Sequence, residues 1–220
     1  APEPVTIYVH EGTYKEGAGS NDIIASIGSS HTQPITILGG CTGTTGTDKS
    51  RGTGHSVYQP TDASIVTTSR PIWLQRATGA NCSLAISQVD VREYSTGAYV
   101  VGSGDFSLTN CNFIKNGDTG ALYAKLTSGT GKVTMYGCEF RGNLKVKDGW
   151  DGYRCPVTVI GNSEINHCAF VGNGNHSDDL VFGGGLGVGG TDASQTIDIS
   201  FCTIAYNNAK QNDSSGLSQH

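Results

Sequence analysis

One short motif recurs four times in this chain and constrains its fold more than any other feature. The motif reads apolar-x-apolar-x-x-Cys-x-Phe/Ile-x-x-Asn, and only Ser163 departs from it, at an apolar position. Its cysteines are Cys111, Cys138, Cys168 and Cys202. A degenerate copy precedes these four, with Val89 at the cysteine position and Tyr94 at the asparagine position. Internal repeats of this kind are typical of solenoids, in which each repeat stacks on the next.

The spacing inside each repeat indicates β-strands and not helices. Each repeat contains two pairs of apolar residues, and the members of a pair stand two positions apart. This spacing matches the two-residue period of a strand, whereas a helix needs a period near 3.6 residues. A two-residue step separates the pairs, and Asn110 and Gly137 suit a sharp bend there because both residue types tolerate positive φ. A third short apolar segment follows in each repeat: Ala98–Val100, Ala121–Tyr123, Val157–Val159 and Leu186–Val188. The sequence therefore predicts an all-β fold, a parallel β-helix with three short strands per coil.

Stacked coils place equivalent side chains above one another, about 4.8 Å apart. The four motif cysteines are therefore expected to form an interior file of thiols that pack as small hydrophobes. Parallel side-chain directions suit a disulfide poorly, and the chain has no CxxC spacing that would indicate a zinc site. The motif asparagines are likewise expected to form a ladder at a turn. Of the other cysteines, Cys41 and Cys82 are candidates for a disulfide if the chain matures in an oxidising compartment.

Composition argues against several functional classes. The net charge of −5 and the pI near 5.6 argue against a nucleic-acid partner, which needs a concentrated basic face. No apolar run approaches the roughly 20 residues of a membrane helix, so no membrane-spanning segment is expected. The start, Ala1–Pro4, lacks the features of a signal peptide, which indicates that a leader was removed or lies upstream.

Several segments resemble known β-helix families. Val5–Glu16, with the sequence VTIYVHEGTYKE, resembles the first coil of pectin-lyase-like β-helices. The Cys-x-Phe-x-x-Asn units and Gly183–Leu186 resemble repeats of bacterial polymorphic outer-membrane proteins, and segment 34–40 resembles their second coil. The resemblance covers nearly the whole chain and implies a right-handed, single-stranded solenoid that is exported, either secreted or on the bacterial cell surface. It implies no single activity, because this architecture hosts lyases, hydrolases, epimerases, tailspikes and adhesins.

The repeats predict a single domain over residues 1–220. After Asn207 the sequence begins another third strand, and no capping segment is visible beyond it. We therefore expect a segment of a larger protein, with further coils or a partner chain at its C-terminal end.

Two long insertions between the Asn turn and the third strand predict a binding face. They are Leu144–Cys155 and Gly174–Gly184, and they leave from equivalent positions of consecutive coils. The predicted binding residues are Trp150, Tyr153, Lys147 and Asp148. Aromatic rings beside carboxylates suit a polysaccharide or cell-surface glycan, because sugar C–H faces stack on rings while hydroxyl groups need polar partners. The alternative is that Trp150 closes over the side of the solenoid and that the charged side chains are simply solvated.

The same insertions hold the candidate residues of an enzyme. If the chain is a polysaccharide lyase or glycoside hydrolase, its catalytic residues are Asp151, Asp178, Asp179, His176 and Arg154. The two neighbouring aspartates resemble those of polygalacturonases, but the other signature elements of that family are absent. No metal site or cofactor is expected, apart from Ca²⁺ for a lyase. The absence of recognisable catalytic motifs favours an exported module with a binding or structural, adhesin-like role.

Overall fold

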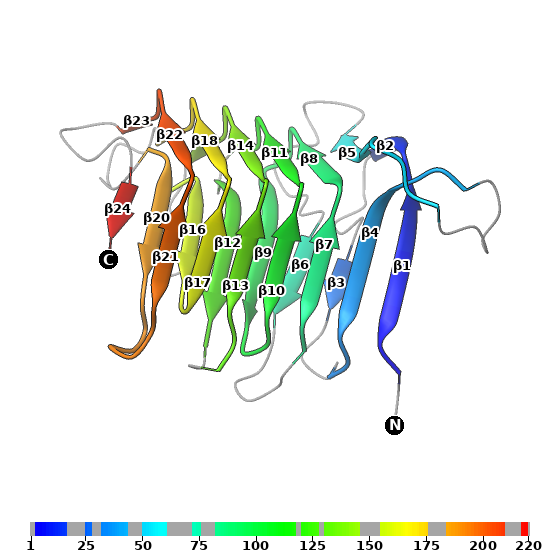
Figure 1. The fold of residues 1–220 in the computed structure, drawn as a ribbon. Coiled ribbons are helices and arrows are strands. Elements are labelled where there is room, and N and C mark those ends of the chain that lie inside the picture. The colour runs from blue at the N-terminus through cyan, green and yellow to red at the C-terminus, as the bar shows by residue number, and fades with distance from the viewer. Residues whose placement is uncertain are drawn as a thin grey trace.

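The computed structural model describes residues 3–16, 25–27, 32–43, 50–60, 72–75, 82–117, 120–127, 130–145, 155–175, 184–209 and 217–219. Every regular element within these residues is a β-strand. The strands form three seven-stranded sheets and one three-stranded sheet, which we name A, B, C and D. Figure 1 shows equivalent strands stacked along one axis, with the termini at opposite ends.

The chain visits sheets A, B and C in turn, and each strand pairs in parallel with the equivalent strand of the next repeat. Sheet A consists of β1 (Val5–His10), β4 (Ile35–Cys41), β7 (Leu84–Ser87), β10 (Phe106–Thr109), β13 (Val133–Tyr136), β17 (Ser163–Asn166) and β21 (Ile197–Ser200). Sheet B consists of β2 (Gly12–Glu16), β5 (Ser56–Pro60), β8 (Val89–Arg92), β11 (Asn112–Ile114), β14 (Glu139–Arg141), β18 (Ala169–Val171) and β22 (Thr203–Ala205). This order is consistent with a parallel β-helix.

The remaining strands form the third and fourth sheets. Sheet C consists of β3 (Ala25–Ile27), β6 (Ile72–Gln75), β9 (Thr96–Gly102), β12 (Gly120–Leu126), β16 (Val157–Ile160), β20 (Leu186–Gly189) and β24 (Leu217–Gln219). Sheet D consists of β15 (Leu144–Lys145), β19 (Gly174–Asn175) and β23 (Asn208–Ala209). The predicted third strands are confirmed, because all four predicted segments lie in sheet C. Sheet D adds a fourth short strand that the sequence pattern did not indicate.

Files of equivalent side chains fill the core. The rings of Phe113, Phe140 and Phe170 stack with centroids 5.1 Å apart, close to the strand separation. The predicted cysteine file is present beside them, and its members are free thiols, buried apart from the half-buried last one. A hydrogen bond with the Cys111 thiol, and then burial, raise the pKa of Cys138. The file therefore consists of neutral thiols that contribute to core packing.

The motif asparagines form the predicted ladder where the chain leaves sheet B. Asn143 Oδ1 accepts hydrogen bonds from the backbone N–H of Asn116 at 2.9 Å and from its Nδ2 at 3.1 Å. Asn143 Nδ2 donates to the carbonyl oxygen of Phe113 at 2.8 Å and to Asn173 Oδ1 at 2.9 Å. Asn173 repeats this pattern, because its backbone N–H and its Nδ2 both donate to Asn207 Oδ1. Each buried amide is thus satisfied by the coils on either side of it.

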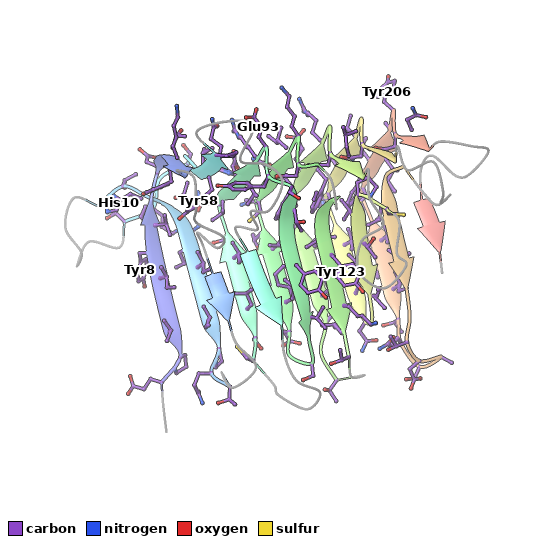
Figure 2. All side chains as sticks on the ribbon, turned by 180° about the vertical axis from the view of Figure 1, so that it is seen from behind. Tyr8, His10, Tyr58, Glu93, Tyr123 and Tyr206 are labelled. Carbon is purple, nitrogen blue, oxygen red and sulfur yellow. The ribbon has the colours of Figure 1, made fainter. Side chains whose placement is uncertain are left out.

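Two corners with left-handed backbone flank sheet B. At the corner between sheets A and B, which we call the A–B corner, the positive-φ residues are Gln88, Asn110, Gly137, His167 and Phe201. At the corner where the chain leaves sheet B, the exit corner, they are Glu93, Lys115, Gly142, Gly172 and Tyr206. The predicted bends are therefore confirmed at the A–B corner. Side chains at these positions project outward, and Figure 2 shows Glu93 and Tyr206 along one edge of the molecule.

One expectation from the sequence is wrong. Cys41 and Cys82 do not form a disulfide, because both are free and their thiols donate to the carbonyl oxygens of Leu38 and Gln33. Between these two cysteines lies β5, which pairs with both β2 and β8.

Candidate functional site

All the residues that the sequence singled out for a site lie outside the described residues. They are Trp150, Tyr153, Lys147, Asp148, Asp151, Arg154, His176, Asp178 and Asp179. The structure does pair the first residues of the two insertions, since Leu144 lies opposite Gly174 in the ladder between β15 and β19. The two insertions therefore begin side by side in neighbouring coils.

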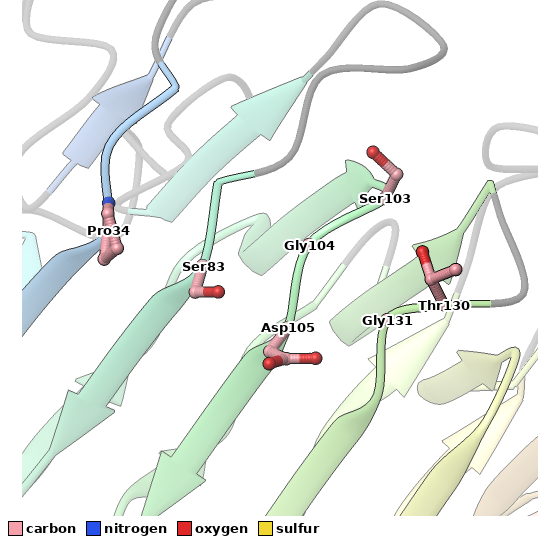
Figure 3. A pocket seen from close by; sticks show the side chains of 7 residues that line it. All are labelled: Pro34, Ser83, Ser103, Gly104, Asp105, Thr130 and Gly131. Carbon is pink, nitrogen blue, oxygen red and sulfur yellow. The ribbon is translucent and has the colours of Figure 1, made fainter.

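A small polar pocket of about 200 Å³ lies where the chain enters sheet A (Figure 3). Its lining consists of Pro34, Ser83, Ser103, Gly104, Asp105, Thr130 and Gly131. Among the described lining residues, Asp105 is the only ionisable one, and its Oδ1 accepts a hydrogen bond from the backbone N–H of Lys132 at 2.9 Å. The described lining therefore does not offer the second titratable group that acid–base catalysis of glycosidic cleavage needs.

A buried carboxylate organises the outer side of sheet B. Asp90 points away from the core, because its neighbours Val89 and Val91 belong to the core, yet only 3% of its side chain is exposed. Its Oδ2 accepts a hydrogen bond from the Arg92 guanidinium at 2.6 Å, and its Oδ1 accepts one from Asn112 Nδ2 at 2.8 Å. Its Oδ1 also lies 2.6 Å from His55 Nδ1. Three donors therefore offset the desolvation of this carboxylate.

His55 reaches Asp90 from the segment between β4 and β5. Gln88 Nε2 holds that segment at the A–B corner by donating to the carbonyl oxygens of Gly52 and Gly54. When His55 Nδ1 carries the proton shared with Asp90, its Nε2 is an acceptor that faces away from the carboxylate. A carboxylate that orients an imidazole is one element of acid–base chemistry. The adjacent Ser56 supplies no nucleophile, because its buried hydroxyl donates to the carbonyl oxygen of His10.

The acid–arginine arrangement recurs two strands further along sheet B. The Arg141 guanidinium donates to Glu139 Oε1 on β14, as Arg92 does to Asp90 on β8. The strand register places Arg92, Ile114 and Arg141 in one outward row. In both pairs the acid is the less exposed partner, with 3% against 39% for Asp90 and Arg92 and 27% against 62% for Glu139 and Arg141. The cations therefore face the solvent.

Beyond β14 the outer side of sheet B carries small and apolar side chains. These are Ala169 and Val171 on β18, and Thr203 and Ala205 on β22. Together with the outward residues of β8, β11 and β14 they form a surface that we call the sheet-B face. Its residues are Asp90, Arg92, Asn112, Ile114, Glu139, Arg141, Ala169, Val171, Thr203 and Ala205. Its two arginines lie on β8 and β14, and the strands beyond β14 carry short side chains.

Three exposed rings border the sheet-B face along the A–B corner. Tyr136, His167 and Phe201, which we call the aromatic strip, come from three consecutive coils. Ring centroids lie 5.3 Å apart for Tyr136 and His167, and 5.0 Å apart for His167 and Phe201. Phe201 is 80% exposed and Tyr136 is 48% exposed. Adjacent exposed rings make this strip a candidate interaction surface, whereas single exposed apolar residues are ordinary.

The sequence contained one signal for this site that the interpretation missed. The residue directly before each motif cysteine occupies the A–B corner, where Gly and Asn are expected, yet His167 and Phe201 stand there. Rings at a left-handed turn are costly for the backbone, by about 1–2 kcal/mol per residue. No comparable signal links His55 to Asp90, because 35 residues separate them.

No protein-family model, curated protein or solved structure matches this chain. Among the described residues there is no cluster of His, Cys, Asp and Glu side chains that could hold a metal ion. That part of the chain also contains no helix of the length and apolar character needed to cross a membrane.

Proposed function

We propose that this chain is a glycan-binding module of an exported surface protein, built as a right-handed, pectin-lyase-like parallel β-helix. The bound sugars lie along the aromatic strip and over the sheet-B face. The adhesin-like role follows from this binding, because a rigid solenoid presents one surface over several coils.

The aromatic strip is the observation that carries this proposal. Sugar rings present C–H faces that stack on aromatic rings, while their hydroxyl groups need polar partners nearby. Tyr136, His167 and Phe201 supply a row of rings, and Asn112, Glu139 and Thr203 supply polar groups on the sheet-B face. The ring spacing of about 5 Å follows the coils, so a linear glycan that runs along the solenoid axis contacts several rings in succession.

The second candidate is a polysaccharide lyase or glycoside hydrolase, with a site beside the insertions 144–155 and 174–184. The imidazole of His55, oriented by Asp90, is the described feature that favours acid–base chemistry. Glycoside hydrolysis, however, needs two carboxyl groups on either side of the scissile bond. Asp90 is buried and shared among three donors, so it does not supply one of them.

A glycan-array screen followed by calorimetric titration tests the proposed function. Phe201→Ala and Tyr136→Ala are expected to weaken binding of the positive glycans at least tenfold. Tyr206→Ala is the matched control, because Tyr206 is 90% exposed on the same coil as Phe201 but lies at the exit corner. Equal losses in all three variants, or no glycan binding at all, would contradict the proposal.

Two further arms of this experiment separate the alternatives. Loss of binding in Trp150→Ala with full binding in Phe201→Ala would move the site to the insertions. Release of reducing ends or unsaturated products from a bound glycan, abolished by Asp178→Asn, would establish the enzyme instead.

A further inference from the structure

We propose that the sheet-B face selects glycans with an anionic group, a carboxylate or a sulfate, on alternate sugars, and that Arg92 and Arg141 bind two successive anionic groups. This inference rests on the proposed glycan-binding function and adds to it the chemical class of the ligand.

The strand register sets the spacing of the two arginines. Both face outward at the same position of their strands, and Ile114 of β11 lies between them. Two strand separations of about 4.8 Å place the two positions roughly 10 Å apart along the solenoid axis. One sugar of an extended β-linked glycan is about as long as one strand separation. A glycan that runs along this axis therefore brings every second sugar to an arginine.

Each arginine is fixed in place by its own carboxylate. The Arg92 guanidinium is held by Asp90, whose position is in turn fixed by Asn112 and His55. The Arg141 guanidinium is held by Glu139. A guanidinium offers five N–H donors, and within the described residues only Nη2 of each arginine has a hydrogen-bond partner. Arg92 Nε is buried, so an anion is bound by the terminal N–H groups of these partly exposed side chains.

The charges around the two arginines produce separate anion sites and not a continuous positive stripe. Lys115 and Glu93 are exposed neighbours at the exit corner, and their opposite charges offset each other. Asp90 and Glu139 formally neutralise the two arginines, but each acid is less exposed to the solvent than its arginine. Ile114, which lies between the two arginines, offers no partner to an anionic group on the intervening sugar.

Calorimetric titration of the whole chain with four oligosaccharide probes tests this inference. The probes are hyaluronan oligosaccharides (a carboxylate on alternate sugars), monosulfated keratan oligosaccharides (a sulfate on alternate sugars), polygalacturonate oligosaccharides (a carboxylate on every sugar) and neutral chitin oligosaccharides. We expect at least one alternating anionic probe to bind tenfold or more tightly than both chitin and polygalacturonate. That preference should fall as ionic strength rises, and whether hyaluronan or keratan binds more tightly identifies the anionic group.

Substitutions of the two arginines test whether these residues cause the preference for anionic probes. Arg92→Gln and Arg141→Gln are each expected to reduce binding of the preferred anionic probe to within about threefold of chitin binding, while chitin binding stays unchanged. Lys132→Gln is the matched control, because it removes a cation of intermediate exposure, paired with Glu164, on the way into sheet A. It should keep the full preference.

The outcomes separate this inference from the proposed function. If chitin and the anionic probes bind equally, and Phe201→Ala still weakens both, the inference is overturned and the glycan-binding function stands. Polygalacturonate binding as tightly as the alternating probes also overturns it, since spacing then plays no part. Binding of none of the probes, together with a blank glycan array, overturns both proposals.

Discussion

The two sides of sheet B are built from the same short strands, yet the inner side chains repeat from coil to coil and the outer ones vary. On the inner side the side chain repeats from coil to coil, as in Phe113, Phe140 and Phe170. On the outer side the equivalent row reads Asp90, Asn112, Glu139, Ala169 and Thr203. An inner residue contacts its own copies above and below, so a change in one coil leaves a cavity against two neighbours. An outer residue meets solvent, and its variation is therefore open to function.

The largest expected effect comes from breaking the inner file. Phe140→Ala removes a fully buried ring that stacks on two others, and we expect a loss of about 3–5 kcal/mol in the free energy of unfolding. Urea denaturation followed by circular dichroism measures it. A loss below about 1 kcal/mol would show that the stacked rings do not form one packed core.

The Asn ladder should be the next most sensitive element. Asn143→Ala leaves the buried backbone N–H of Asn116 without its acceptor, and we expect a loss of about 1–3 kcal/mol in unfolding free energy. Asn166→Ala, at the outward end of β17, is the control and should change stability by less than about 0.5 kcal/mol. Equal effects of the two substitutions would argue against a structural ladder.

The cysteine file predicts a loss of stability at alkaline pH. The pKa of Cys138 is raised above its ordinary value by the hydrogen bond with Cys111 and by burial, so the folded state keeps a proton that the unfolded state releases. Stability is therefore complete below a pH of about 9 and declines as the pH rises further. As the pH rises through that range, we expect the free energy of unfolding of Cys138→Ala to fall by about 1 kcal/mol less per pH unit than that of the parent protein. Urea midpoints of both proteins between pH 8 and 10 provide the measurement, and parallel curves would contradict the prediction.

Replacing an outer acid should cost more stability where the acid is more deeply buried. Asp90→Asn weakens the bonds from Arg92 and His55 at a buried position, and we expect a loss of about 1 kcal/mol because both partners are partly exposed. Glu139→Gln, at the equivalent position of the more exposed pair, should cost less than about 0.5 kcal/mol. Urea midpoints of the two variants decide this, and a reversed order would show that Asp90 does not organise the face.

The smallest stability effect is expected at the aromatic strip. Phe201→Ala removes a ring that is 80% exposed, so the unfolding free energy should stay within about 0.5 kcal/mol of the parent. Thermal and urea unfolding check this, alongside the tenfold loss of glycan binding proposed above. A ring whose removal costs more than about 1 kcal/mol would belong to the fold and not to a binding surface.

The sequence predicted the parts of this protein that repeat. The cysteine file, the Asn ladder and the A–B bends follow from fixed local spacings, because each of these residues lies beside its own copies in adjacent coils. The third strands follow from short apolar segments that recur once in each repeat. The strand β5 shows the limit of that inference, since it carries no motif cysteine and the repeat did not indicate it. The nine residues proposed in the insertions stay a prediction.

Only the tertiary structure brought His55, Asp90, Arg92 and Asn112 together and aligned Arg92 with Arg141 in one outward row. The repeat length varies from coil to coil, so the distance between such residues in the sequence carries no constant signal. The register of parallel strands sets their distance in space, and that register depends on the inner side chains. The repeating core, which the sequence pattern predicts, thus determines where the less regular outer residues meet.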